Sequence, residues 1–457
     1  MIFFTKSVPV KSFKVNIKLR LWFVVFSFVF SSILLNMNIY ICSASTSDIP
    51  TQSNLHAKYC ALIDGDNGRL LFGKDSDVEA PMASTTKIMT CLVALQANPQ
   101  DYIATVSPYA ASMPDVQLNA VKGQQFHLND LLYSIMLKSH NDTAVIIAEN
   151  YAFHYLCTHP EFLSSMYSSE ESNMPYDFLT DDILASDDSS ILSTFTAAES
   201  KALVHIFARI MNEKASEFGC SHTYYITPNG LDSTDETGEH HTTAYELALI
   251  MSKCIENPEF NKVCQTKSYS FSDISGKSNY SVGNANAFLN MYDHIIAGKT
   301  GFTGNAGYCY VCAYQADGRT FIVALLACGW PSNKTYKWKD ARLLLNYARE
   351  HYLPKEILSP SILTKEITVQ DGKSSTIQAE VCYSYTCLLS DSDQINVVYK
   401  IPKTIRAPIK SGQPVGTVTI YINELSIQEY PVICCTSVDK ISFMDSFSDV
   451  LTRFLPL

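Results

Sequence analysis

The order of helix-like and strand-like segments changes sharply at LPKEILSPSIL, residues 353–363. Beyond this stretch, residues 365–436 are almost wholly strand-like, with apolar runs such as GTVTIYIN and QEYPVICC. Before it, residues 56–353 mix strand patterns with helical ones. Because each domain packs its layers around one core, this change predicts two folded units. We expect an α+β domain at 56–353, a linker, and a small β domain at 365–436.

Within the first unit, strand-like segments lie near both ends and helical patterns lie between them. Residues 58–75 predict two short strands around a Gly-Asp-Asn-Gly turn, and AGYCYVCAYQ and TFIVALLACG predict two more strands. Helical periodicity begins near Ser84, Leu128 and Asp142, and returns in KWKDARLLLNYAREHY. Helices must therefore pack against a sheet in this unit.

The N-terminal segment has the pattern of a secretory signal. Five basic residues and no acidic one precede Asp48, and an apolar run follows from Leu21 to Leu35. A small residue at Ala44 fits a cleavage site, so we predict a signal peptide over residues 1–44. The alternative is an uncleaved anchor that extends to Ile41. Either interpretation places the rest of the chain outside the cytoplasm.

Charge and cysteine usage exclude some functions. The net charge is −11, and the N-terminal segment contributes only positive charge, so the remainder is more acidic still and no nucleic-acid binding is expected. Most of the 14 cysteines lie in apolar runs, as Cys91 and Cys328 do, and we predict that they are small buried side chains. Cys309 and Cys312 are spaced like a redox or zinc pair, but on a strand they face opposite sides, which favours packing.

Two segments depart from the pattern of a compact core. Residues 158–196 are rich in acid and serine and lack Lys and Arg, so we expect a solvated, mobile inserted loop; a lid over the active site is the alternative. At the C-terminus, residues 440–457 predict an amphipathic helix that lies in a membrane surface or packs back onto the protein. Its apolar stripe comprises Phe443, Met444, Phe447, Val450, Leu451, Phe454 and Leu455.

Three short polar motifs suggest catalysis when they are taken together. Ser84 and Lys87, in ASTTKIMT, would lie one helical turn apart and within reach of each other. The same spacing recurs at Ser437 and Lys440, so this pair alone is weak. Two further motifs follow it along the chain, KSHNDTA and AGKTGFTGNAGYC. They contribute Ser139, Asn141, Lys299, Thr300 and Gly301.

With these motifs in this order, the chain resembles the penicillin-recognising serine acyl transferases, whose signature is Ser-x-x-Lys, Ser-x-Asn and Lys-Thr-Gly. It is more narrowly similar to the D-alanyl-D-alanine carboxypeptidases among the low-molecular-mass penicillin-binding proteins, also through TPNGL and HHTTAYELA. The similarity spans about residues 56–457, although that family is not expected to carry the acidic insert. It implies a β-lactamase/transpeptidase-like domain with an antiparallel sheet between helices, then a β-sandwich and a membrane-surface helix.

The resemblance also implies a reaction and its partners. The enzyme would remove the terminal D-alanine from peptidoglycan stem pentapeptides through an acyl-enzyme, and β-lactam antibiotics would acylate the same serine. No metal or cofactor is needed. The protein would act outside the cytoplasm, attached to the outer face of the cell membrane.

Roles for the first and second motifs follow from this resemblance. Ser84 would be the nucleophile, and Lys87 would accept its proton if burial and the positive Lys299 keep Lys87 uncharged. Ser139 would relay the proton toward the leaving amine, and Asn141 would hold the substrate amide.

Roles for the third motif complete the predicted site. Lys299 and Thr300 would bind the terminal carboxylate of the substrate, and Gly301 would let the substrate backbone pack closely against the strand. The backbone N–H groups of Ser84 and Phe302 would hold the oxyanion. The side chain of Phe302 is then free to shape the mouth of the pocket.

Two other functions remain to be separated from this one. A β-lactamase uses the same nucleophile, but the Glu-x-x-Leu-Asn stretch of one lactamase class is absent from the sequence. A non-catalytic, penicillin-sensing cell-wall module would not need all three motifs intact. His240 and His241 have no spaced partner for a metal, so we assign them structural roles. The sequence leaves open a role in growth or in spore-wall maturation, and the preferred third residue of the stem peptide.

Overall fold

The computed structural model describes residues 49–96, 102–163, 176–363 and 366–454. The predicted signal peptide at 1–44 lies outside the described residues, as does the middle of the acidic insert. Among the helices that the structure describes, none is both long and apolar enough to cross a membrane.

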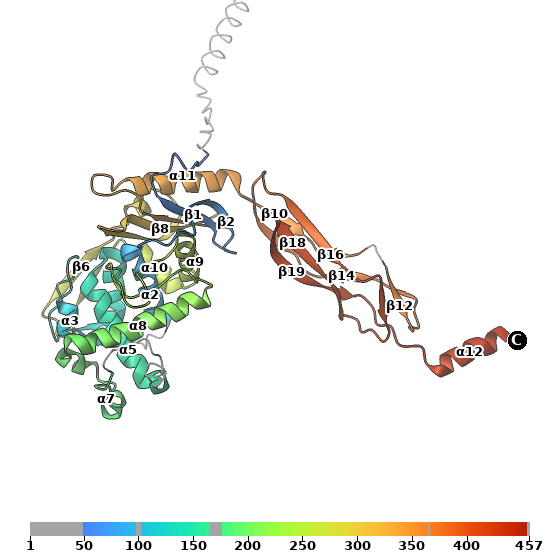
Figure 1. Ribbon diagram of the computed structural model, residues 1–457, viewed down its shortest axis with the longest axis horizontal. Coiled ribbons are helices and arrows are strands. Elements are labelled where there is room, and N and C mark those ends of the chain that lie inside the picture. The colour runs from blue at the N-terminus through green and yellow to red at the C-terminus, as the bar shows by residue number, and fades with distance from the viewer. Residues whose placement is uncertain (1–48, 97–101, 164–175, 364–365, 455–457) are drawn as a thin grey trace, which may run out of the picture. The chain divides into compact units, whose positions relative to one another are not determined.

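A five-stranded antiparallel sheet organises the first domain (Figure 1). Its strand order is β2-β1-β9-β8-β7, so β7 lies at one edge. The pairings β8 with β9 and β1 with β2 are hairpins, as their turn residues predict. The strands are β1 Tyr59–Asp64, β2 Leu70–Lys74, β7 Ile295–Thr303, β8 Gly307–Ala316 and β9 Arg319–Leu326.

Helices cover both faces of this sheet, which confirms the predicted fold class. Helix α11, Tyr336–His351, packs on one face (Figure 1). The other face packs against a helical layer that includes α2 Lys87–Gln96, α5 Asn141–Thr158, α8 Ala197–Glu217 and α9 Ala244–Cys254.

The strand β8 shows why its sequence is apolar almost throughout. Cys309 and Val311 point into the larger core under the helical layer, whereas Tyr310 and Cys312 point into the core beneath α11. A strand that is covered on both faces needs apolar residues at every position. Cys309 and Cys312 are both buried on opposite faces, so the expected packing role is confirmed.

Shorter elements connect the sheet and the helices. They are η1 Ala83–Thr86, β3 Ile103–Thr105, α3 Pro108–Ala111, β4 Gln125–His127, α4 Leu128–Tyr133, η2 Ser134–Lys138, α7 Asp181–Ser186, η3 Ser189–Thr194, α10 Pro258–Gln265, β5 Ser268–Ser272, β6 Asn279–Gly283 and η4 Ala287–Asn290.

The prediction of a solvated loop is wrong for residues 176–196, the later half of the acidic insert. This stretch forms α7 and η3, and its apolar side chains join the larger core. Ser189 Oγ also donates a hydrogen bond to the Ile103 carbonyl oxygen at 2.7 Å. The acidic residues of the stretch face solvent while Tyr176 and Leu192 between them are buried, so average composition gave the wrong prediction.

The second domain consists of strands, as predicted. Its main sheet has the order β11-β14-β19-β18-β16, and a smaller sheet has the order β13-β12-β17. The expected linker is itself strand β10, Leu353–Leu358, which pairs with β15. The other strands are β11 Ser361–Ile362, β12 Ile367–Gln370, β13 Thr376–Ile377, β14 Ala379–Val381, β15 Tyr385–Leu389, β16 Ile395–Lys400, β17 Thr404–Arg406, β18 Pro414–Ile422 and β19 Leu425–Cys434.

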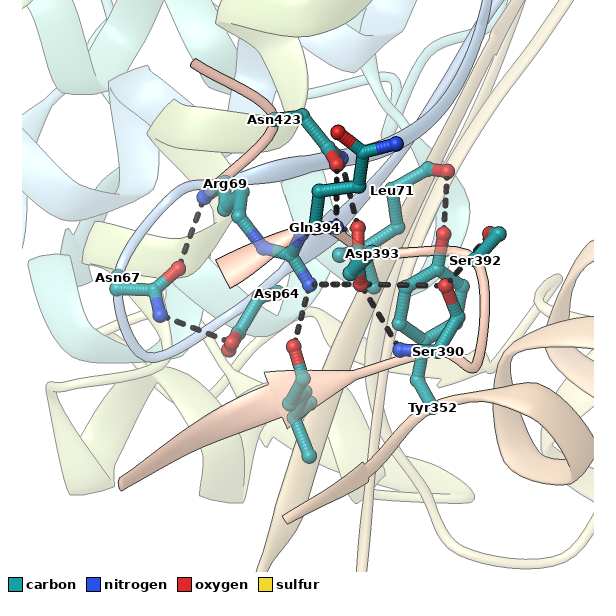
Figure 2. Close-up of polar contacts among 11 residues, drawn as sticks. Asp64, Asn67, Arg69, Leu71, Tyr352, Ser390, Ser392, Asp393, Gln394 and Asn423 are labelled. Carbon is teal, nitrogen blue, oxygen red and sulfur yellow. Dashed lines mark hydrogen bonds and ion pairs between the residues drawn. The ribbon is translucent and has the colours of Figure 1, made fainter. Parts of the chain in front are cut away.

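A buried ion pair joins the β1–β2 hairpin to the loop after β15 (Figure 2). The Arg69 guanidinium donates to both carboxylate oxygens of Asp393 at 3.1 and 3.3 Å, and also to the Leu388 carbonyl oxygen. Asp393 accepts further hydrogen bonds from the Ser390 N–H and the Asn423 amide. Burial alone would raise the pKa of Asp393, but these hydrogen bonds outweigh it and lower that pKa.

The last helix, α12, Phe443–Phe454, carries the described part of the predicted apolar stripe, and Leu455 lies outside the described residues. Phe443, Met444 and Phe447 are exposed. Ser442 caps the helix, because its hydroxyl accepts from the Asp445 N–H while the Asp445 carboxylate accepts from the Ser442 N–H.

Candidate active site

The nucleophile lies in a tight turn directly before a helix. Ser84 belongs to the 3₁₀ turn η1, which runs directly into α2 at Lys87, so the helical pattern expected from Ser84 begins with a 3₁₀ turn. Ala83 has a φ of 49°, in the left-handed region that alanine rarely adopts. Strain of this kind persists only where the surroundings hold it, and it is common at active sites.

A buried histidine supports this turn. The His240 Nδ1 accepts a hydrogen bond from the Ile226 N–H at 3.0 Å, so its Nε2 carries the proton and donates to Thr86 Oγ1 at 2.8 Å. Thr86 in turn donates to the Ala83 carbonyl oxygen at 2.8 Å. Burial lowers the pKa of His240 to about 3, so the ring stays neutral. This contact chain refines the structural role that the sequence predicted for His240.

Lys87 is placed to act as a base toward Ser84. Its Nζ lies 2.9 Å from Ser84 Oγ, 3.0 Å from Asn141 Oδ1 and 2.5 Å from the Asn229 carbonyl oxygen. The oxygens of Asn141 and Asn229 can only accept hydrogen bonds. A neutral amine has two N–H donors, which these two acceptors use. Its lone pair is then left for the hydroxyl proton of Ser84.

The surroundings of the two lysines favour the uncharged form. Burial holds the pKa of Lys87 well below its ordinary value, and the nearby Lys299 ammonium lowers it further. Burial also lowers the pKa of Lys299, to about 7. The lowered pKa of Lys87 favours its neutral amine, whereas Lys299, with a pKa of about 7, divides between its charged and neutral forms near neutral pH.

Lys299 and Ser139 face each other across the site. The Lys299 Nζ lies 2.9 Å from Ser139 Oγ and 2.9 Å from the Thr300 carbonyl oxygen. Ser139 ends the turn η2 with a φ of 67°, in the left-handed region, directly before helix α5. The second motif thus enters the site at the junction between two helical segments.

The third motif occupies the edge strand β7, where one row of main-chain groups has no neighbouring strand in the sheet that the structure describes. A Cβ at Gly301 would lie only 2.9 Å from Ser84 N, so the glycine makes room for the turn that carries Ser84. Its role toward a substrate backbone stays a prediction. The Phe302 side chain is exposed and packs on Tyr308, with 4.7 Å between the two ring centroids. Both residues line the groove.

These residues surround one groove, with a volume of about 520 Å³. Ser84, Ser139, Asn141 and Thr300 to Phe302 line it, while Lys87 and Lys299 lie buried beneath its surface. The structure thus brings together all eight residues that the sequence proposed, from η1, α2, η2, α5 and β7.

Sequence reasoning missed Lys337, at the start of α11. This side chain lines the groove, with its Nζ 4.5 Å from the Tyr308 ring centroid and 4.7 Å from the Trp338 ring centroid. Burial lowers its pKa. Nothing in KTYKWKD marks one lysine among three, so only the fold identifies it.

The TPNGL segment contributes backbone that sequence reasoning did not assign. The Asn229 carbonyl oxygen orients the Lys87 amine, and Gly230, with a φ of 79°, lies where any side chain would collide with the Ala83 carbonyl oxygen. The glycine within this motif was the sequence signal that could have identified this role.

Among the described residues, no group of three or more His, Cys, Asp or Glu side chains is placed to hold a metal ion.

The fold and the site together are those of a serine acyl transferase, with a lysine amine within proton-transfer distance of the serine. Comparison with known families identifies which one. The family described as D-alanyl-D-alanine carboxypeptidase matches residues 46–171 and 163–328, and a second family, the C-terminal domain of penicillin-binding protein 5, matches residues 354–440. The chain belongs to the D-alanyl-D-alanine carboxypeptidase family, as its motifs predicted.

Individual relatives are similar to this chain over most of their own length. D-alanyl-D-alanine carboxypeptidase DacF of Bacillus subtilis is 24% identical over 396 residues, which cover 85% of this chain and 87% of the relative. DacC of Escherichia coli is 24% identical over 419 residues, which cover 88% and 89%. The structure of penicillin-binding protein 5 from Haemophilus influenzae shares the fold, with a TM-score of 0.59 at 20% identity over 86% of this chain and 99% of that one.

Proposed function

We infer that this protein is a serine-type D-Ala-D-Ala carboxypeptidase that removes the terminal D-alanine from peptidoglycan stem pentapeptides. The family match supports the activity, and the placement of Lys87 beside Ser84 carries the mechanism. β-Lactam antibiotics are expected to acylate the same serine.

In acylation, Lys87 Nζ takes the Ser84 proton while Ser84 Oγ attacks the carbonyl carbon of the penultimate D-alanine. Backbone N–H groups of Ser84 and Phe302 would hold the oxyanion, and each such donor lowers the barrier by roughly 3 kcal/mol. The C–N bond then breaks, and the proton held by Lys87 passes through the Ser139 hydroxyl to the nitrogen of the departing D-alanine, which leaves Lys87 neutral again.

In deacylation, water attacks the ester carbon and Lys87 accepts the proton of that water. The ester bond to Ser84 breaks, Lys87 returns the proton to Ser84 Oγ, and the tetrapeptide leaves with a new carboxylate. Lys299, Thr300 and Lys337 offer the cations and hydroxyl at the groove that would bind the terminal carboxylate of the pentapeptide.

Mass spectrometry after incubation with penicillin tests this function against its rivals. A long-lived adduct on Ser84 with D-alanine release from a muramyl pentapeptide supports the carboxypeptidase. Rapid loss of the adduct would indicate a β-lactamase instead. An adduct without any D-alanine release would indicate a penicillin sensor.

We also propose that the protein is exported and attached to the outer face of the cell membrane. The exposed apolar stripe of α12 and the basic, then apolar, N-terminal sequence support this proposal. The described charges on α12 include Asp445, so apolar burial and not lipid charge would provide the binding energy. Sedimentation with phosphatidylcholine vesicles tests it: the full chain should bind, and a Phe443→Ser, Phe447→Ser variant should not. Equal sedimentation of both proteins would contradict this.

A further inference from the structure

One rim of the active-site groove is formed by the loop of residues 112–123, which is tied to Asn141. The Asn141 N–H donates to the Val116 carbonyl oxygen at 2.7 Å. The Asn141 side-chain amide donates to the Pro114 and Asp115 carbonyl oxygens at 3.2 and 3.1 Å. The backbone at Asp115 is therefore fixed directly beside a residue that would bind substrate.

A buried carboxylate fixes the next part of the same loop. Asp142, in the first turn of α5, accepts hydrogen bonds from the Leu118 N–H at 2.9 Å and the Ala120 N–H at 3.2 Å. Together, Asn141 and Asp142 hold the loop on both sides of residue 117. Its side chains at the rim are thus presented from a defined backbone, which is what selective binding requires.

The Asp115 side chain is the acidic group of this rim. It is exposed and lines the groove, and it is the only acidic residue among the described residues that do so. Within the described part of the chain, its carboxylate has no ion pair or hydrogen bond. The cations that line the groove are Lys334 and Lys337, at the start of α11. The groove therefore carries charges of opposite sign, and the negative one is beside Asn141.

The position of Asp115 relative to a substrate rests on the proposed function. The bond that is cleaved joins the fourth and fifth residues of the stem peptide. The amide held by Asn141 is the preceding one, which joins the third and fourth residues. We therefore expect the side chain of the third residue to emerge next to Asn141, on the side of the groove that Asp115 lines.

We propose that Asp115 is a specificity-determining residue that binds a primary amine on the side chain of the third residue of the stem peptide. An unpaired carboxylate at the mouth of a groove attracts an ammonium group and loses no internal partner when it binds one. A lysine or a diaminopimelate at this position supplies such an amine. Penicillin carries no counterpart of it.

The test compares D-alanine release from two pentapeptides that differ only at the third residue, L-lysine or Nε-acetyl-L-lysine. We expect the wild-type kcat/KM to be roughly three- to fivefold higher for the free amine, the range of an exposed ion pair. Asp115→Asn should reduce this ratio to about one while leaving the rate on the acetylated peptide and penicillin acylation unchanged. Asp115→Glu should keep the preference, and Asp66→Asn, on the β1–β2 turn, is the matched charge control.

A diaminopimelate pentapeptide then separates the two natural sources of the amine. Of the lysine and diaminopimelate pentapeptides, the one whose kcat/KM falls more in Asp115→Asn carries the third residue that the site selects. If wild type processes the free and acetylated peptides equally, the role of Asp115 is wrong although the carboxypeptidase function stands. If no peptide releases D-alanine while penicillin still labels Ser84, the proposed function itself fails.

Discussion

The active site and the joint between the β1–β2 hairpin and β15 both bury ionisable side chains, but those of the joint have partners of opposite charge and those of the active site do not. Arg69 and Asp393 form a two-point ion pair, and further hydrogen bonds satisfy the carboxylate. Lys87 and Lys299 have only neutral partners, namely hydroxyl, amide and carbonyl oxygens. Paired charge keeps its ionised form and stabilises the fold. Unpaired buried amines hold their protons less tightly, and Lys87, the amine beside Ser84, is thereby suited to act as a base.

This difference predicts that the two sites respond to substitution in opposite ways. The largest effect should come from Lys87→Met. Without the base, the rate of penicillin acylation should fall about 10²- to 10⁴-fold. Because a buried, unpaired amine is removed, the free energy of unfolding should rise by about 1–2 kcal/mol. Stopped-flow acylation and chemical denaturation measure the two quantities.

The matched control for this change is the exposed Lys58→Met, which should alter neither quantity. A fall in stability in Lys87→Met would mean that the amine is charged and well solvated or paired in the folded protein. That result would remove the contrast between the two regions.

The converse change is Arg69→Ala at the domain joint. It leaves the Asp393 carboxylate buried without its partner and should destabilise the protein by about 3–5 kcal/mol. Penicillin acylation at low temperature should stay close to wild type, because the groove does not contain this pair. Thermal unfolding and acylation rates test the two halves of this prediction.

An exposed ion pair in the second domain provides the control. Arg406→Ala removes the surface contact with Asp371 and should cost less than about 1 kcal/mol. A double variant, Arg69→Met with Asp393→Leu, should recover most of the stability lost in Arg69→Ala. Failure to recover it would show that the joint depends on the ionic contact itself.

The two regions should also respond differently to pH. With Lys299 at a pKa of about 7, kcat/KM should fall as pH rises above that value, by up to tenfold per unit, because the carboxylate-binding cation is lost. A substrate whose terminal carboxylate is amidated should lack this decline. A profile that is flat from pH 7 to 9 for both substrates would contradict it.

The free energy of unfolding should also depend on pH, because the pKa values of Lys299 and Asp393 differ between the folded and unfolded chain. The unfolded chain binds a proton at Lys299 that the folded chain has lost, so this residue makes stability rise between about pH 7 and 10. The lowered pKa of Asp393 stabilises the fold above the unfolded value near 4, and this contribution disappears as pH falls through the folded value. Denaturation midpoints across pH measure both, with Lys299→Met and Asp393→Asn identifying each group.

The smallest effect concerns the support of the nucleophile turn. His240→Ala removes the donor to Thr86 and should slow acylation about tenfold, the cost of one buried hydrogen bond. His240→Gln can still donate to Thr86 and should restore most of kcat with KM unchanged. An equal loss in both variants would mean that the ring acts only by filling space.

The sequence predicted the side chains of the site better than its backbone. Ser84, Lys87 and Asn141 belong to short motifs, and the types and spacing of the residues in these motifs predict their chemistry. The Asn229 carbonyl oxygen leaves no such trace, because any residue has one. Lys337 and Asp115 lie outside these motifs. They line the groove only because the fold brings α11 and the loop of residues 112–123 next to the motif residues, and the sequence does not show this.

The same distinction explains the errors in the fold. The short apolar run of β8, followed by an Asp-Gly turn, predicted a strand correctly because these signals are local in the sequence. The insert at 158–196 was judged by its average composition, which hides buried Tyr176 and Leu192 among exposed acidic residues. The segment at 353–363 looked like a linker because the partner strand β15, which satisfies its backbone, lies about 30 residues further on.

The proposed mechanism requires that Lys87 is uncharged in the folded enzyme near neutral pH. Nuclear magnetic resonance of protein labelled at the lysine side-chain nitrogen measures this directly, with Lys87→Arg used to assign the signal. We expect the Lys87 amine to titrate well below the ordinary lysine pKa of 10.5 and to be neutral at pH 7. A Lys87 signal that remains that of an ammonium group up to pH 9 would contradict it.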